Sequence, residues 1–174
     1  MSRDDLKLKI KNNEYERLDN STKEKLKKEE KLQVQDLVKN PIILKTNKEI
    51  IKEEALQQLI LEDMENFLVE LGNGFSFIKS EYKIKIGNNY NYIDLLLYNI
   101  TYNCYVVIEL KVTKLKKEHI GQIETYMNYV DKNLKTITQD KTIGIIITKK
   151  DNKFIMEYCS DERILNTTYE LQGV

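Results

Sequence analysis

Two apolar segments decide the fold of this chain: YIDLLLY at residues 92–98 and VVIELK at residues 106–111. Each is short and rich in residues that favour strands, which predicts a buried β-strand. Each also carries charge inside the apolar run, Asp94 in the first and Glu109 with Lys111 in the second. Successive side chains of a strand alternate between faces, so Glu109 and Lys111 point the same way. If the two strands pair, Asp94 can join them.

Burial makes this pattern informative. A carboxyl group that faces a core without a partner is strongly destabilising or shifts its pKa upward. The ordinary alternatives are an edge-strand position for Asp94 and a surface ladder pair for Glu109 and Lys111. Leu96 shares the predicted face of Asp94, and residues 106–110 are almost continuously apolar, as in a central strand. Three charged residues on two central strands therefore favour a functional site over a solvated surface.

Two carboxylates beside an ammonium group suit a hard cation and phosphodiester hydrolysis. Mg²⁺ (or Mn²⁺) prefers oxygen ligands, and we expect Asp94, Glu109 and the backbone carbonyl of Leu110 to hold it. Lys111 would position or help to deprotonate a water and offset charge on the transition state. DNA is the expected substrate. The alternative is a catalytically inactive module that binds nucleic acid or a protein partner.

Composition limits the class of protein. The chain has 174 residues, 41% of them apolar, enough for one domain with its own core. Basic and acidic residues are equal at 28 each, so any contact with nucleic acid needs a local patch. Cys104 and Cys159 have no paired spacing, which argues against a zinc site or a disulfide framework. No segment reaches the roughly 18 apolar residues of a membrane span, so we expect a cytoplasmic protein.

Hydrophobic spacing divides the chain at Pro41, its only proline. Residues 1–40 are dense in charge and predict a helical arm, either solvated or used for docking or dimerisation. Residues 41–174 form the main predicted domain. Its predicted elements are a helix at 48–71, strands at 75–80 and 81–86, a turn at 87–89, strands at 92–98 and 104–111, a helix at 116–133, and strands at 142–148 and 154–159. This order predicts an α/β fold with a mixed sheet flanked by helices, in which strands 104–111 and 142–148 are parallel.

Further candidates surround the central strands. Gln122 and Tyr126 lie one turn apart on a helix, where the glutamine could bind a phosphate or orient Lys111 and the tyrosine could contact a nucleic-acid backbone. An exposed polar helix face is the alternative. His119 is expected at the surface. A basic rim is predicted around the strand ends, with simple solubility as the alternative: Lys79, Lys83, Lys85, Lys114, Lys116, Lys117, Lys149, Lys150 and Lys153. Of these lysines, Lys114, Lys116 and Lys117 are the expected nucleic-acid contacts.

The arrangement of Asp94 and Glu109-x-Lys111 resembles the active-site signature of the PD-(D/E)XK nuclease superfamily, with Ile93 where its proline would stand. From about residue 33 onward, the chain is similar to the C-terminal nuclease domain of bacterial YhcG-type proteins. The similarity rests on FLVELGNGF at 67–75, the strand at 92–98, IELK at 108–111, GQ at 121–122 and IGII at 143–146.

The resemblance implies a restriction-endonuclease-like fold and a metal-dependent deoxyribonuclease with Asp94, Glu109 and Lys111 at its centre. It also implies an additional acidic group from the first long helix, for which Glu54, Glu62 and Glu70 are candidates. Glu62 is the preferred candidate, and a solvated helix face is the default alternative for all three. A helical N-terminal domain, mostly missing from this chain, and a setting of defence, mobile elements or recombination are further implications. Cutting both strands of a duplex would favour a homodimer.

Overall fold

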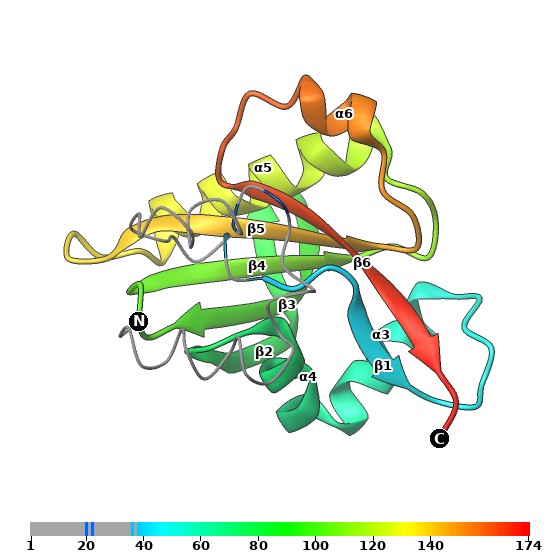
Figure 1. Cartoon of the computed structure of the whole chain (residues 1–174). Helices are drawn as coiled ribbons and strands as arrows, with labels where there is room; N and C mark the ends of the chain where they lie inside the picture. The colour runs from blue at the N-terminus through cyan, green and yellow to red at the C-terminus, as the bar shows by residue number, and fades with distance from the viewer. Residues whose placement is uncertain (1–19, 21, 23–35, 37) are drawn as a thin grey trace.

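The computed structural model describes residues 20, 22, 36 and 38–174 (Figure 1). Most of the predicted charged arm at 1–40 therefore lies outside the described residues. The described helices and strands follow one another in the order β1 (Ile42–Lys45), α3 (Glu53–Glu62), α4 (Met64–Leu71), β2 (Phe75–Ile86), β3 (Asn89–Asn99), β4 (Cys104–Leu110), α5 (Lys117–Asn133), β5 (Asp140–Thr148), α6 (Lys153–Glu157) and β6 (Ile164–Gln172).

The strands of this region form one mixed sheet in the order β1-β6-β5-β4-β3-β2. Strands β2, β3 and β4 are antiparallel neighbours. Strands β4, β5, β6 and β1 run parallel. The parallel pairing of β4 with β5 through α5 confirms the predicted strand-helix-strand unit, and the mixed sheet flanked by helices confirms the predicted fold class.

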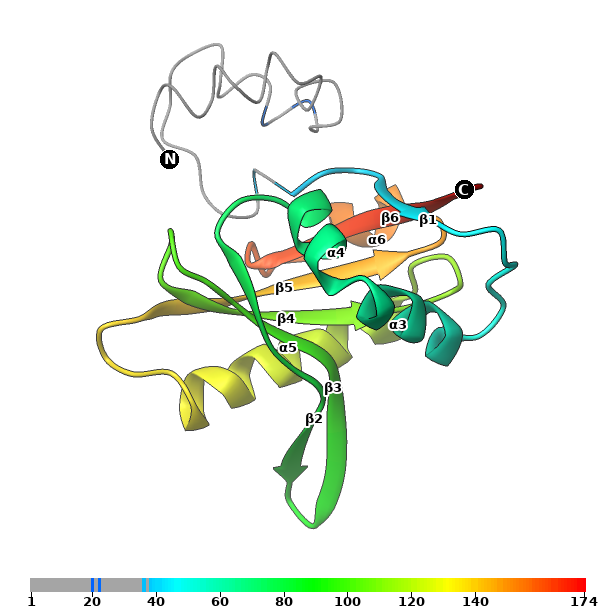
Figure 2. The ribbon, with the colours of Figure 1, turned by 90° about the horizontal axis from the view of Figure 1, so that it is seen from below.

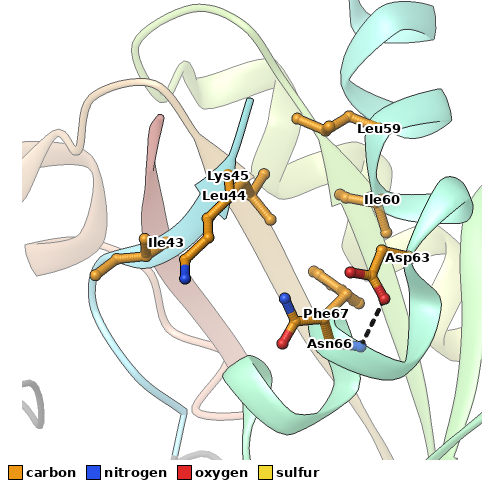
Figure 3. Close-up of a pocket in the computed structure, with 8 residues that line it drawn as sticks. All are labelled: Ile43, Leu44, Lys45, Leu59, Ile60, Asp63, Asn66 and Phe67. Carbon is orange, nitrogen blue, oxygen red and sulfur yellow. Dashed lines mark hydrogen bonds between the residues drawn. The ribbon is translucent and has the colours of Figure 1, made fainter. Parts of the chain in front are cut away.

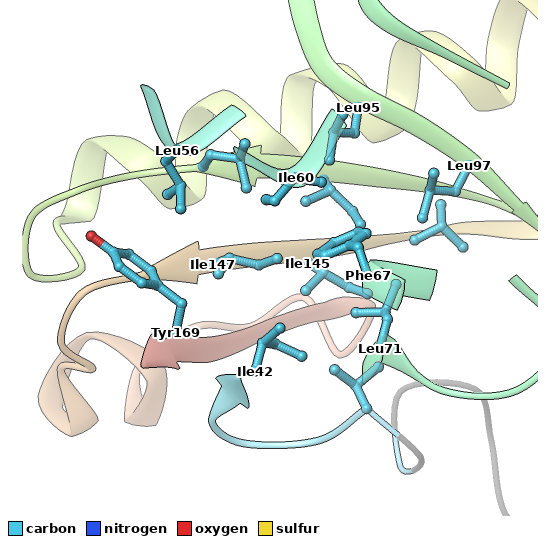
Figure 4. Packing of buried hydrophobic residues seen from close by; sticks show 14 of the residues in the cluster. Ile42, Leu56, Ile60, Phe67, Leu71, Leu95, Leu97, Ile145, Ile147 and Tyr169 are labelled. Atoms are coloured by element: carbon cyan, nitrogen blue, oxygen red, sulfur yellow. The ribbon is translucent and has the colours of Figure 1, made fainter. Parts of the chain in front are cut away.

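Helices cover both faces of the sheet and bury two apolar clusters. On one face, α3 and α4 pack on β3 and β5, as Figure 4 shows for Leu56, Phe67, Leu95 and Ile145. On the other face, α5 lies over the central strands, and its apolar side chains join Leu96 and Val107 in the second cluster. Figure 2 shows the sheet between these layers. The sheet therefore keeps β3 and β4 buried on both sides, as their apolar sequences predict.

Gly144 on β5 sets how closely α5 approaches the sheet. A Cβ atom at this position would lie 2.6 Å from Sδ of Met127 and 3.0 Å from Cδ1 of Ile123. These distances leave no room for a side chain between helix and strand. The glycine thus allows α5 to lie close to β4 and β5, which brings its polar residues near the end of β4.

Three element predictions are corrected by the structure. The single helix at 48–71 is two helices, because Asp63 leaves helical geometry (φ −141°, ψ 64°) and its carboxylate accepts a hydrogen bond from the N–H of Asn66 at 3.3 Å. The strand at 154–159 is wrong: this segment contains α6, and the side chain of Asn152 accepts from the N–H of Ile155 to begin it. Strands 75–80 and 81–86 are one strand, β2, with a register shift between Phe77 and Lys79.

Two strands, β1 and β6, were not predicted from the sequence. The short β1 follows Pro41 directly, and β6 mixes apolar with polar residues, so neither carries a strong strand pattern. A pocket of about 50 Å³ lies beside β1 and is shown in Figure 3; it is lined by Ile43, Leu44, Lys45, Leu59, Ile60, Asp63, Asn66 and Phe67. None of these is a predicted site residue. In the described part of the chain, no helix combines the length and the apolar character needed to cross a membrane.

Candidate active site

The site begins where the ladder between β3 and β4 ends. Backbone pairing runs from Asn99 opposite Cys104 to Leu95 opposite Ile108. At the next position two side chains bridge the strands. The backbone N–H of Asp94 donates to Oε2 of Glu109 at 2.9 Å, and the backbone N–H of Leu110 donates to Oδ2 of Asp94 at 2.8 Å. The two carboxylates are therefore held side by side by the backbone of the two strands.

Strand β3 also turns at Asp94. Leu95 packs with α3 and α4, whereas Ile93, two residues earlier, belongs to the cluster under α5. Strict alternation would place both on one face. Opposite this point, β2 places Glu81 at φ 49°, in the left-handed region that L-residues with bulky side chains rarely adopt. The turn separates Asp94 from the regular sheet and aims its carboxylate along the end of β4.

Burial dominates the electrostatics of the pair. Glu109 is only 2% exposed, and burial raises its pKa well above the usual range, with the charge of Asp94 raising it further. Burial also raises the pKa of Asp94 to about 6, although the N–H of Leu110 and the charge of Lys111 oppose the shift. The positive charge of Lys111 is thus too weak to offset burial and return the two pKa values to their ordinary range. This donor set fits a divalent cation, which would supply the missing charge.

Lys111 follows β4 directly. Its backbone N–H donates to the carbonyl of Ile147 at 2.9 Å, so the end of β4 stays in register with β5. Its positive charge lowers the pKa of both Asp94 and Glu109, so Lys111 acts electrostatically on both carboxyl groups. His119 is half-buried rather than fully at the surface, and Nδ1 accepts from the N–H of Lys116 at 3.0 Å at the start of α5. Burial and then the charge of Lys111 lower the pKa of His119.

Helix α5 carries Gln122 and Tyr126, and the charges of Glu109 and Asp94 act on Tyr126. Nε2 of Gln122 donates to the hydroxyl of Tyr126 at 3.3 Å. Tyr126 is 5% exposed, so it does not lie on an exposed polar face. Burial raises its pKa, and the charge of Glu109 adds to the shift. The buried hydroxyl is better placed to hold Gln122 than to touch a nucleic acid, and the role of each residue stays a prediction.

Acidic residues around Asp94 differ from those expected. Besides Lys111, the charges that act on Asp94 come from Glu81 on β2 and Glu53 on α3. Glu62 is exposed at the opposite end of α3 from Glu53, nine residues or about 14 Å along the helix. Glu70 accepts a hydrogen bond from the N–H of Ile43 at 2.9 Å and so contacts β1. Of the acidic residues on α3 and α4, Glu53 is the one whose charge raises the pKa of Asp94, and the choice of an additional acidic group for the site stays a prediction.

One supporting residue was missed from the sequence. Nε2 of Gln57 donates to the backbone carbonyl of Asp94 at 3.0 Å and fixes the point where β3 turns. Gln57 lies one turn after Glu53 on α3, so the two share a helix face. This polar pair, spaced four residues apart on a helix that also has an apolar face, was the sequence signal that could have pointed to Gln57. Among the described residues, no group of three or more His, Cys, Asp or Glu side chains is placed to hold a metal ion, and the Leu110 carbonyl stays a predicted ligand.

The predicted basic contacts occupy the connection from β4 to α5. Lys114, Lys116 and Lys117 are all exposed there, three to six residues after Lys111. Lys114 forms a parallel bridge with Lys150, which ties this connection to the end of β5. Their exposed position in the connection that follows Lys111 agrees with a role in holding phosphates, which stays a prediction.

Comparisons with known proteins give the family. The sequence model of the family described as YhcG PDDEXK nuclease domain matches residues 35–172. A curated relative, "Putative nuclease YhcG" from Escherichia coli (strain K12), is 24% identical over 115 residues, which cover 65% of this chain and 31% of that protein. This chain therefore spans about a third of the length of the curated relative that it matches.

One solved structure supports the fold, and another with a lower TM-score also matches. EndoMS, in a complex with double-stranded DNA, matches with a TM-score of 0.50 and 21% identity, covering 71% of this chain and 47% of that one. A repair endonuclease from Pyrococcus abyssi matches with a TM-score of 0.47 and 18% identity, covering 71% of this chain and 49% of the other. The mixed sheet is restriction-endonuclease-like. Because the family model covers most of its length, this chain belongs to the YhcG PDDEXK nuclease domain family of the PD-(D/E)XK superfamily.

Proposed function

We propose that this nuclease domain hydrolyses DNA phosphodiester bonds in a reaction that depends on a divalent metal ion. The observation that carries the proposal is a pair of hydrogen bonds that join β3 and β4 next to Lys111. Oε2 of the buried Glu109 accepts from the N–H of Asp94, and Oδ2 of the half-buried Asp94 accepts from the N–H of Leu110. A pair of like charges in a buried position is destabilising unless a cation joins it, which is why strongly shifted carboxylates mark candidate functional sites.

The metal would be held by Asp94, Glu109 and the backbone carbonyl of Leu110. Mg²⁺ or Mn²⁺ fits these oxygen donors, and water would complete the coordination. When bound, such an ion polarises the scissile phosphate and lowers the pKa of a water molecule. The raised pKa of both carboxyl groups supports this assignment, because a bound cation would restore their ionised forms.

The remaining residues orient the reactants. Lys111 would place the attacking water, help to accept its proton and offset negative charge that develops on the phosphate oxygens. Gln122 would contact the phosphate or orient Lys111. Its hydrogen bond to the buried Tyr126 restricts the rotation of the glutamine side chain and so supports a fixed orientation.

DNA is the proposed substrate. The structural neighbour EndoMS is seen with double-stranded DNA, which supports this substrate class for the shared fold. The exposed Lys114, Lys116 and Lys117, in the connection that follows Lys111, would contact the phosphate backbone. Cleavage of both strands would use a two-fold homodimer, which size measurement with and without DNA would detect.

The test is a panel of linear, branched and single-stranded DNA incubated with Mg²⁺ or Mn²⁺. Wild type should cleave at least one substrate, and Lys111→Ala should lose cleavage while retaining its fold. Lys132→Ala is the matched control, because Lys132 is an exposed lysine in the last turn of α5 and lies outside the candidate site. Equal cleavage by wild type and Lys111→Ala would exclude the mechanism.

A role in defence, mobile-element or recombination processes rests on family membership. Cells that express the wild-type gene should then differ from cells that express Lys111→Ala in phage survival, plasmid uptake or recombination frequency. Identical frequencies in all three measurements would exclude these settings. Cell fractionation would test the proposed cytoplasmic location.

A further inference from the structure

Strands β2 and β3 extend beyond the rest of the sheet. The β3–β4 ladder stops at Leu95, but β2 and β3 remain paired as far as Ile86 opposite Asn89. Residues 82–93 therefore form a two-stranded ribbon, called here the hairpin arm, and Figure 2 shows it projecting from the body of the molecule. Gly87 occupies the two-residue turn with φ 62°, a conformation that favours glycine and matches the strand twist.

The inner face of the hairpin arm anchors it. Ile84 is 1% exposed and Ile93 is fully buried, and both belong to the cluster that includes Ile123 of α5. Tyr82 and Ile86 pack partly against the same cluster. An isolated two-stranded hairpin is marginally stable in water, so this packing is what keeps the arm in place. The packing of the inner face therefore holds the hairpin arm in one position relative to the body of the domain.

The outer face carries lysine and tyrosine. Lys83 pairs with Tyr92 and Lys85 with Tyr90, and all four side chains are exposed. Residues 82–93 contain two lysines and no acidic residue, although the whole chain has a net charge of zero. The hairpin arm is therefore a local basic surface of the kind that a neutral protein needs to meet a phosphate backbone.

The lysines are held in place over one ring. Nζ of Lys83 lies 4.1 Å from the ring centre of Tyr90, and Nζ of Lys85 lies 5.7 Å from it. Both distances are within the range of a cation–π interaction. Because the ammonium groups occupy the ring surface, Tyr90 is poorly suited to stack on a base. The arrangement favours charge contacts with phosphates over base stacking.

We propose that the hairpin arm binds the backbone phosphates of a DNA duplex whose scissile phosphate lies at Asp94 and Glu109. The inference rests on the proposed function and specifies duplex DNA as its substrate class. Asp94 lies at the base of the arm, and Tyr90 is four residues away, or about 14 Å at the rise of a strand. That length corresponds to about four base pairs. A two-stranded ribbon is also narrow enough to lie in a major groove.

Salt dependence of binding tests the inference. The full chain with Lys83→Gln and Lys85→Gln is compared with wild type and with the control Lys132→Gln, Lys141→Gln, which removes the same charge from exposed positions on α5 and β5. Each binds a labelled duplex of about 20 base pairs, and its single strand, in EDTA over a salt series. Each lost phosphate contact reduces the slope of log K against log salt by about 0.9. The arm variant should lose about 1.8 from the duplex slope, and the control should match wild type.

An unchanged slope, or equal losses in the arm variant and the control, would overturn the inference. A loss confined to the single strand would overturn the choice of duplex. Thermal melting checks that the arm variant is folded. Cleavage by wild type in Mg²⁺ or Mn²⁺ is scored separately against Lys111→Ala. Failure of that cleavage test would exclude the proposed nuclease mechanism and leave the duplex-binding slope interpretable.

Discussion

Glu109 holds the backbone of Asp94: Oε2 of Glu109 accepts the hydrogen bond from the N–H of Asp94 at 2.9 Å. Asp94 in turn accepts from the N–H of Leu110, next to Glu109 on β4. The two side chains thus satisfy backbone donors that the ladder leaves without a backbone acceptor. Their positions are fixed by the sheet, which is the preorganisation that a metal site needs.

Asp94→Asn should stabilise the metal-free protein at pH 8. The folded pKa of Asp94 is about 6, above its ordinary 3.8. The stability linked to this group is therefore fully present below about pH 4 and is lost as pH rises through 6. Asparagine keeps an oxygen for the N–H of Leu110 but carries no charge, so we expect a gain of about 1–3 kcal/mol at pH 8. Urea unfolding in EDTA would measure it.

Asp161→Asn provides the control of opposite sign. Asp161 forms a 2.7 Å ion pair with Arg163, and that hydrogen bond lowers its pKa. The contribution of Asp161 to folding stability is present above its unfolded pKa and is lost as the pH falls through its lowered folded pKa. Asp161→Asn should therefore destabilise the protein at pH 8. A stabilising Asp161→Asn, or a gain from Asp94→Asn that persists unchanged at pH 4, would contradict the electrostatic account.

Divalent ions should raise the melting temperature of the wild type, and more at pH 8 than at pH 5. Protons compete with the ion for Asp94 and Glu109. Because the pKa values of both groups are raised, this competition continues at pH values above 4, where ordinary carboxyl groups are already ionised. An ion at ten times its Kd would add about 1.4 kcal/mol of stability. Thermal melting with Mg²⁺ or Mn²⁺ would measure the shift. An equal shift in Asp94→Asn would place the ion elsewhere.

Gln122→Ala and Tyr126→Phe should slow cleavage together. The two residues share one hydrogen bond, and its loss is expected to lower kcat by about 3- to 10-fold for either change. Because both changes remove the same contact, the loss in kcat of the double variant should be only slightly larger than the loss of either single variant. Single-turnover rates would give the coupling. Fully multiplicative losses would show that Tyr126 does not act through Gln122.

Gly144→Ala should destabilise the protein by about 1–3 kcal/mol, because the new methyl group would meet Met127 and Ile123 of α5. Gly121→Ala is the control within that same helix: a Cβ there meets nothing within 4 Å. Replacing this helical glycine should instead stabilise by about 1 kcal/mol. Chemical unfolding of both variants would compare them, and a neutral Gly144→Ala would mean that α5 can shift away from the sheet without loss.

The central strands and their charged residues could be predicted because burial leaves few explanations for a carboxylate in an apolar run. Asp94 and Glu109 stood out for this reason. The last third of the chain was harder. Segment 154–159 has the apolar and aromatic residues of a strand, but the capping contact of Asn152 and the packing of Ile155 and Met156 against the second apolar cluster favour a helix. Short-range pattern cannot reveal a choice made by tertiary contacts.

The surroundings of Asp94 also could not be predicted from the sequence. Alternation predicted a regular β3, whereas the strand turns where Glu81 adopts a positive φ. Glutamate gives no signal for that conformation, unlike glycine. Consequently Glu81 and Glu53 were missed as charges near Asp94, and Glu62, on a plausible helix face, was preferred. The relevant information is the register between strands far apart in the chain, which spacing within one segment does not contain.

Strand β1 has its partner at the other end of the described chain, since Ile42–Lys45 pairs with β6 at Ile164–Gln172. During synthesis, β1 must wait until more than one hundred later residues have been translated before its hydrogen bonds can form. Until β6 arrives, the apolar β5 is an open edge of the sheet, a surface that invites pairing with other chains. Nascent chains stalled before β6 should therefore need chaperone protection, because the sheet that carries the candidate site on β3 and β4 is completed only when β6 and β1 pair.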